Sequence, residues 1–166
     1  LPGYTGAFVP APGFSEYKEA LEASKIPVRD IFYRPREDDN GKPYFEVPYL
    51  ALETFAAELK GQDGRIIVFL GNPNNPDGTL LDKDHIRTVA SMLKDANSLL
   101  VIDESFIDFV GNDPLQDNEH SMRSLVNEFD NIIVVHSFTK FYAVPGLRIG
   151  AAFANETLIT QLQQYI

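Results

Sequence analysis

The chain has 166 residues, 44% of them hydrophobic and 23% charged, a composition typical of a globular domain large enough to bury a core. Its 24 acidic and 14 basic residues leave a net charge of −10, which argues against non-specific binding of nucleic acid. The absence of cysteine excludes disulfides and thiolate metal sites, and no apolar run approaches the roughly 18 residues of a membrane span.

The N-terminus carries neither a basic region nor a long apolar block, so no signal peptide is expected. Together with the lack of cysteine, this favours a cytoplasmic protein. The chain opens on Leu1 rather than on methionine, which leads us to expect that it is cut from a longer protein.

Apolar periodicity predicts strands that alternate with helices. The expected strands are residues 7–10, 28–33, 65–70, 98–102, 132–136 and 149–153. The expected helices are residues 15–24, 49–60, 82–94 and 123–129, and one that begins near residue 155. Several of the strands are continuous apolar runs, typical of strands buried on both faces. The pattern predicts an α/β fold of three layers, with helices on both sides of one doubly wound, mostly parallel sheet.

Local signals predict where some of these elements begin and end. Ser15 and Asp82 are candidate N-caps of the helices that follow them. The charged segment at residues 34–43 contains Asn40-Gly41, a pair typical of a turn. Residues 111–122 are polar and predict a loop.

Polar side chains follow three of the buried strands. Asn75 lies in the loop after residues 65–70, Asp103 directly follows residues 98–102, and Lys140 comes shortly after residues 132–136. Ligands bind beyond the carboxyl ends of the strands in such sheets, so these side chains are expected at one site. Each has an ordinary alternative: a tight loop, an ion-paired carboxylate, and a solvated surface lysine.

The segment around Lys140 combines groups that suit a phosphorylated aldehyde. The lysine amine can form a Schiff base with an aldehyde. Ser137 and Thr139 lie just before the lysine and Arg148 follows it eight positions later, and such groups can hold a phosphate. A Pro-Gly pair before Arg148 predicts a bend that brings the arginine back toward the site.

Four segments in order, residues 11–17, 71–78, 103–109 and 136–150, resemble the class I/II aminotransferase family. These are fold-type I enzymes that use pyridoxal 5′-phosphate (PLP). The resemblance covers essentially the whole chain. It implies the family's mixed seven-stranded sheet with its first strand missing, which leaves five parallel strands and an antiparallel strand at residues 149–153.

The resemblance implies catalytic roles for two residues. Lys140 would form the internal aldimine with PLP, and Asp103 would pair with the pyridine nitrogen, where an opposite charge favours the protonated ring. It also implies cofactor-binding roles beside them. Phe14 would stack on the pyridine ring, and Asn75 would donate to the phenolic oxygen of the cofactor.

The same resemblance implies a site for the cofactor's phosphate. Ser137 and Arg148 match the positions that hold the 5′-phosphate in the family. Thr139 occupies a position that is often a second hydroxyl, so we count it among the cofactor-binding residues as well.

Two residues depart from the family's pattern. Asp77 stands where threonine is usual. Phe106, which we also place at the cofactor, stands where many aminotransferases have a tyrosine whose hydroxyl contacts the phenolic oxygen. The run at residues 103–109, Asp-Glu-Ser-Phe-Ile-Asp-Phe, is similar to that of threonine-phosphate decarboxylases of cobalamin biosynthesis.

Three functions are therefore compatible with the sequence. The first is a PLP-dependent aminotransferase of the histidinol-phosphate type, acting on a small amino acid or amino-acid phosphate. The second is a lyase similar to threonine-phosphate decarboxylase, favoured by Phe106. The third is a Rossmann-like binding module, although the chain has no Gly-x-Gly-x-x-Gly and no Walker loop.

No metal, nucleic-acid or membrane partner is expected. His85, His120 and His136 lack the spacing of metal ligands, and His136 is expected to pack or hydrogen-bond at its strand end. We assign no catalytic role to Glu104.

Residues 1–166 are expected to form one partial domain, the large PLP-binding domain of a longer enzyme. The family's N-terminal arm and C-terminal small domain are absent from this sequence, together with the arginine that usually holds the substrate carboxylate. Members of the family are typically homodimers. We therefore expect the chain on its own to bind PLP weakly and not to turn over.

Overall fold

The structure is a computed structural model that describes residues 3–59, 64–111 and 118–165. Its central sheet consists, in the described residues, of β1 (Gly6–Ala11), β2 (Val28–Phe32), β5 (Ile66–Gly71), β6 (Leu99–Asp103), β7 (Ile132–Ser137) and β8 (Gly150–Phe153). The strands are arranged in the order β2-β1-β5-β6-β7-β8. All neighbouring strands pair in parallel except β8, which runs antiparallel to β7.

This sheet confirms the predicted α/β class, the mostly parallel pairing and the antiparallel last strand. Each strand boundary falls within one residue of its prediction. For β5, β6 and β7 the accuracy has a physical cause: strands buried on both faces are continuous apolar runs, and such runs stop where polar or turn-forming residues begin.

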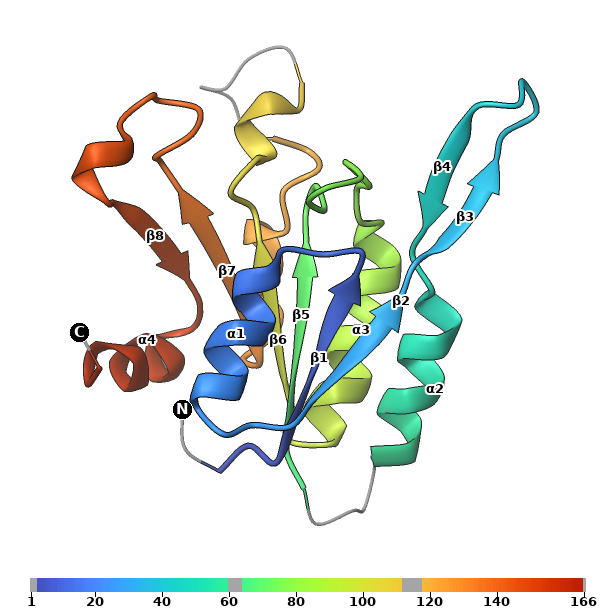
Figure 1. Ribbon diagram of the computed structural model, residues 1–166. Coiled ribbons are helices and arrows are strands. Elements are labelled where there is room, and N and C mark those ends of the chain that lie inside the picture. Colours follow the sequence, from blue (N-terminus) through green and yellow to red (C-terminus); the bar gives the residue numbers. More distant parts are fainter. Residues whose placement is uncertain (1–2, 60–63, 112–117, 166) are drawn as a thin grey trace.

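Helices cover both faces of the sheet (Figure 1). The helices α1 (Ser15–Ala23) and α4 (Glu156–Gln163) pack on one face, and α2 (Tyr49–Leu59) and α3 (Lys83–Asp95) on the other. The expected end of α2 at residue 60 lies outside the described residues. Among the residues that are described, no helix is long and apolar enough to cross a membrane.

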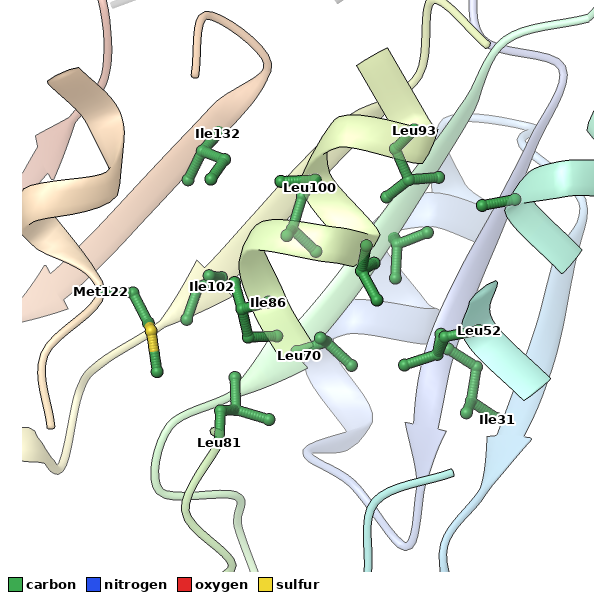
Figure 2. Close-up of a cluster of buried hydrophobic side chains, with 14 of the residues drawn as sticks. Ile31, Leu52, Leu70, Leu81, Ile86, Leu93, Leu100, Ile102, Met122 and Ile132 are labelled. Atoms are coloured by element: carbon green, nitrogen blue, oxygen red, sulfur yellow. The ribbon is translucent and has the colours of Figure 1, made fainter. Parts of the chain in front are cut away.

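Alternate residues of each strand enter two separate hydrophobic clusters. In β6, Leu100 and Ile102 pack toward α2 and α3, whereas Leu99 and Val101 pack toward α1 and α4. Figure 2 shows the larger cluster, in which Ile86 of α3 lies against the strand side chains. A fully buried side chain of this size contributes about 1.5–3 kcal/mol to the free energy of unfolding. Alternation also means that consecutive residues at a strand end point to opposite faces.

The segment expected to be a charged turn is a complete hairpin. β3 (Arg34–Glu37) pairs antiparallel with β4 (Pro43–Glu46), and the Asn40-Gly41 turn joins them. The carboxylate of Asp38 accepts from the backbone amides of Asn40 and Lys42 and closes the turn. A proline in each strand and the lack of apolar alternation concealed these strands in the sequence.

The structure corrects two predictions about the helices. Ser15 is not the N-cap of α1: the cap is Phe14, which makes no side-chain capping hydrogen bond, because the helix begins with Ser15 itself. The helix expected at residues 123–129 is the shorter 3₁₀ helix η2 (Arg123–Asn127). Short segments between two anchored ends commonly adopt this tighter form.

The prediction for α3 is confirmed, since Asp82 is its N-cap. Its carboxylate accepts from the backbone amides of Asp84 and His85. The bond from the backbone of His85 is the largest of the effects that hold the pKa of Asp82 below its ordinary value of 3.8. A depressed carboxyl pKa stabilises the fold above the unfolded-state pKa, and this stability is lost as the pH falls through the folded-state pKa.

Replacing Asp82 by alanine is expected to lower the free energy of unfolding by about 1 kcal/mol, because α3 loses its cap. Asp82→Asn is the matched control, since an amide oxygen still caps the helix but does not titrate. Urea unfolding from about pH 7 down to about pH 3 measures both effects. We expect Asp82→Asn to match the wild type at neutral pH and to lose less stability in acid. Equal acid losses in the two proteins would contradict this assignment.

Candidate functional site

The carboxyl ends of β1, β5, β6 and β7 lie at one edge of the sheet (Figure 1). A cavity of about 40 Å³ lies between the segments that follow these strands. The residues that line it are Phe14, Tyr17, Pro73, Asn75, Asp103, Ser105, Phe106 and Lys140. Five residues that the sequence singled out are thus brought together from four segments far apart in the chain.

Asp103 is the last residue of β6 and is held by hydrogen bonds at both carboxylate oxygens. Its Oδ1 accepts from the backbone amide of Ser105 at 2.8 Å, and its Oδ2 accepts from the hydroxyl of Tyr17 at 2.7 Å. Both donors are neutral groups, so they do not cancel the negative charge of the carboxylate. This half-buried negative charge faces the cavity and can attract a cationic group there.

Tyr17 is a site residue that the sequence analysis missed. Its ring stacks on Phe69 at 5.3 Å between centroids and meets the edge of Phe14 at 5.6 Å. Burial, and then the neighbouring charge of Asp103, raise the pKa of the Tyr17 hydroxyl well above its ordinary value. The hydroxyl therefore stays protonated and remains a donor to Asp103. Its signal in the sequence was position alone: Tyr17 follows Phe14 by three residues, on the same side of α1.

Lys140 lies with its amine above an aromatic ring. Its Nζ is 5.0 Å from the centroid of the Phe106 ring, at a distance suited to a cation–π contact. The lysine side chain is exposed, and Phe14, which also lines the cavity, keeps 41% of its surface exposed. A primary amine and one aromatic side chain are thus accessible at the rim of the cavity, with Asp103 also in its lining.

The loop that carries Asn75 is shaped by the residues around it. The amide of Asn74 donates to the backbone oxygen of Pro12 at 3.0 Å and to Oδ2 of Asp77 at 2.7 Å. Oδ1 of Asp77 accepts from the backbone amide of Thr79. Asp77 therefore closes the loop itself, which gives a local reason for an acid at a position where the family usually has threonine.

Glycine is required at the start of this loop. A Cβ at Gly71 would lie 2.8 Å from the Cα of Asn74, closer than real side chains approach. The tight turn after β5 therefore requires glycine at position 71. The placement of Asn75 at the cavity depends on this turn.

The three residues expected to hold a phosphate do not line the cavity. The hydroxyl oxygens of Ser137 and Thr139 are 2.7 Å apart and hydrogen-bond to each other. The expected bend is confirmed: a 3₁₀ helix, η3 (Pro145–Leu147), precedes Arg148, whose φ of 51° is left-handed. The chain then returns beside β7, where Phe138 donates to the backbone oxygen of Ile149. The side chain of Arg148 is exposed.

A larger hollow of about 950 Å³ lies between the β3–β4 hairpin, α2 and the start of α3. Its walls are mostly aromatic and aliphatic side chains, and it contains none of the strand-end residues Asp103, Ser137 or Lys140. In the described residues, no group of three or more His, Asp or Glu side chains could hold a metal ion. We therefore centre the candidate site on the smaller cavity.

Solved structures share this fold. The PLP-bound C-S lyase from Staphylococcus hominis, in complex with the inhibitor L-cycloserine, has a TM-score of 0.76 to this chain. The match covers 99% of this chain and 38% of that one at 18% sequence identity, so it shows the fold alone. The chain thus has the fold of a PLP-dependent fold-type I enzyme.

Curated relatives match at higher identity. The chain is 34% identical over 149 residues to threonine-phosphate decarboxylase of Salmonella typhimurium, covering 87% of this chain and 35% of that enzyme. It is 31% identical over 149 residues to histidinol-phosphate aminotransferase of Thermoanaerobacter pseudethanolicus, covering 90% of this chain and 35% of that enzyme. The chain spans about a third of the length of these relatives.

The family model described as aminotransferase class I and II matches residues 2–166, and the chain belongs to that family. This confirms the resemblance found in the sequence. The family depends on PLP, so the residues at the strand ends can be compared with what this cofactor requires.

Replacing Tyr17 by phenylalanine is expected to lower the free energy of unfolding by about 1.5–3 kcal/mol, because it removes a hydrogen bond to a charged group. In an Asp103→Ala background the same replacement should cost less than about 1 kcal/mol, since the charged partner is gone. Urea unfolding of the four proteins measures the coupling. Tyr44→Phe, on the exposed surface of β4, is the control and should change stability by no more than about 0.5 kcal/mol. Equal costs in both backgrounds would contradict the Tyr17–Asp103 contact.

Proposed function

We propose that this chain is the PLP-binding part of an enzyme that transforms amino acids or amino-acid phosphates, with Lys140 as the lysine that bonds to the cofactor. The observation that carries the proposal is the position of Lys140 and Asp103. Asp103 ends β6 and Lys140 follows β7, yet both line one cavity together with Phe14 and Asn75.

The chemistry of these side chains fits the cofactor. PLP has an aldehyde, a basic ring nitrogen, a phenolic oxygen and a phosphate. The exposed amine of Lys140 matches the aldehyde, the carboxylate of Asp103 matches the protonated nitrogen, and the amide of Asn75 matches the phenolic oxygen. The exposed ring of Phe14 matches the flat face of the pyridine.

When bound, PLP supplies an aldehyde that captures an amine and a ring that withdraws electrons from the bonds at the substrate's Cα. Asp103 serves this chemistry by keeping its negative charge next to the ring nitrogen. Tyr17 and Ser105 hold the two oxygens of that carboxylate in place, so it cannot turn away toward solvent. Tyr17 is thus a positioning residue for Asp103.

For the phosphate we propose Ser137, Thr139 and Arg148. The paired hydroxyls of Ser137 and Thr139 lie at the end of β7, three residues and one residue before Lys140. The return of the chain through η3 brings the backbone of Arg148 beside this strand end. Two hydroxyl donors and a guanidinium are suited to a dianionic phosphate.

As the reaction we propose transamination of the histidinol-phosphate type, in agreement with the family and with the relative from Thermoanaerobacter. Decarboxylation of a threonine phosphate is the second candidate. It is supported by Phe106, which has no hydroxyl to offer the cofactor, and by the relative from Salmonella. Both reactions begin with the same capture of the substrate amine, so Lys140 and Asp103 serve either one.

We also propose that the chain is the partial large domain of a longer, homodimeric, cytoplasmic enzyme. Support comes from its length relative to the two curated enzymes and from the family resemblance. The remaining parts, an N-terminal arm and a small domain, would complete the substrate site.

Borohydride reduction of the chain with PLP is expected to leave a phosphopyridoxyl label on Lys140, detected by peptide mass spectrometry. The amine is accessible and lies beside the groups that fit the ring. Lys140→Ala should lose this label, while the exposed Lys42, on the turn between β3 and β4, serves as the reference for non-specific labelling. Labelling of Lys140 no stronger than that of Lys42 would contradict a formed cofactor site in this chain.

The two reactions can be separated in the full-length enzyme. Transamination of the histidinol-phosphate type predicts that histidinol phosphate passes its amino group to 2-oxoglutarate, which is converted to glutamate. Decarboxylation predicts that threonine phosphate releases carbon dioxide without any acceptor. Lys140→Ala should abolish whichever activity is found. Carbon dioxide release without transamination would replace the first candidate by the second.

A further inference from the structure

Behind the cavity, on the opposite face of the sheet, lies a group of polar side chains that the proposed function does not use. We call it the rear network, and it consists of Asn72, Glu104, Asp108, Arg123 and His136. Its position follows from strand alternation. In β6 and β7 the odd-numbered residues pack toward α1 and the even-numbered residues toward α3. Asp103 and Ser137 therefore lie on the α1 face, whereas Glu104 and His136 point to the other face.

Within this network, Glu104 has an evident structural role. It is fully buried and accepts hydrogen bonds from the amide of Asn72, the hydroxyl of Ser121 and the backbone amide of Met122. Arg123 lies 3.6 Å from the carboxylate. These donors and the nearby guanidinium stabilise the buried charge, which accounts for the presence of a carboxylate at this position.

The contact between His136 and Asp108 is different. Nε2 of His136 lies 3.0 Å from Oδ2 of Asp108, and the two side chains are only 3% and 9% exposed. Nδ1 of His136 and Oδ2 of Asp108 are both buried, and neither makes a hydrogen bond in the described part of the chain, so the 3.0 Å contact is a close ionic contact rather than a hydrogen bond. The guanidinium of Arg123 is 4.0 Å from Asp108, at the limit of an ion pair. A buried pair that leaves two polar atoms without hydrogen bonds is a poor source of stability, so we look for its role in the segments that it connects.

The pair connects the segment that carries Phe106 with the segment that carries Lys140. Asp108 belongs to the 3₁₀ helix η1 (Ile107–Phe109) and follows Phe106 by two residues, whereas His136 precedes Lys140 by four. Three contacts join these segments in the described residues. They are the buried His136–Asp108 pair, the rings of Phe109 and Phe141 at 5.1 Å, and the amine of Lys140 over Phe106.

We propose that His136 and Asp108 form a positioning pair that holds the amine of Lys140 over the ring of Phe106. The buried pair joins the two segments, and the more exposed aromatic contacts between them keep their alignment only while this pair is in place. The proposal rests on Lys140 being the reactive lysine of the proposed function. It adds two residues on the far face of the sheet that act on this lysine without touching the cofactor site.

The test compares variants of His136 that differ only in reach. The side-chain nitrogen of glutamine lies near the position of Nε2, so His136→Gln can still bring an N–H group close to Oδ2 of Asp108. Asparagine ends near the position of Nδ1, so His136→Asn cannot. Asp108→Asn removes the negative charge of the side chain and keeps its shape. His85→Ala is the matched control, because it removes the exposed His85–Asp82 contact at the start of α3 and leaves the rear network intact.

The readout is trace acetylation by acetic anhydride in the absence of PLP, scored by mass spectrometry as the ratio of Lys140 to Lys42. An amine that no longer lies over the Phe106 ring is less shielded from the reagent, so His136→Asn and Asp108→Asn should raise the ratio about two- to fivefold. His136→Gln and His85→Ala should keep the wild-type ratio. Thermal unfolding of each variant establishes that it is folded at the labelling temperature.

The proposal is overturned if folded Asp108→Asn keeps the wild-type ratio, or if His136→Gln and His136→Asn give the same ratio. Because no cofactor is present, this result is independent of borohydride trapping. Failure of PLP to label Lys140 would count against the proposed function, whereas an unchanged acetylation ratio would count against the positioning pair alone.

Discussion

The arrangement of the site depends on a buried carboxylate that does not belong to it. Glu104 has no exposed surface, and a charge in that position would cost several kcal/mol without hydrogen bonds. Its partners come from the loop after β5 and from the segment that leads into η2. Satisfying this one group therefore holds the ends of β5 and β6 and the start of η2 together, and the site is built on those ends.

The neighbouring residue shows how one strand serves two purposes. Asp103 and Glu104 are adjacent acids, but the pleat of β6 directs them to opposite faces. On the rear face the carboxylate is surrounded by donors and fixes the backbone. On the front face Asp103 has two neutral donors and an open side toward the cavity. The buried face thus supports the face that lines the cavity, and the His136–Asp108 contact lies on the same buried face at the end of β7.

Much of this could be predicted from the sequence, and the residues that escaped prediction share a reason. The strands, the Asp82 cap and the meeting of Asn75, Asp103 and Lys140 depend on local pattern and on the general geometry of parallel sheets. Tyr17 was missed because its partner is 86 residues away. The β3–β4 hairpin was missed because its prolines and charges contradict the usual strand pattern.

The sequence by itself determined the fold class, the family and which side chains follow each strand, because buried strands and turn-forming residues leave a signal in their immediate neighbours. Only the tertiary structure decided what those side chains contact. It assigned Glu104 to the interior and Asp103 to the cavity, paired His136 with Asp108, and placed Lys140 above Phe106. These contacts join segments far apart in the chain, and no local pattern can specify them, since they depend on how the strands are ordered and packed in space.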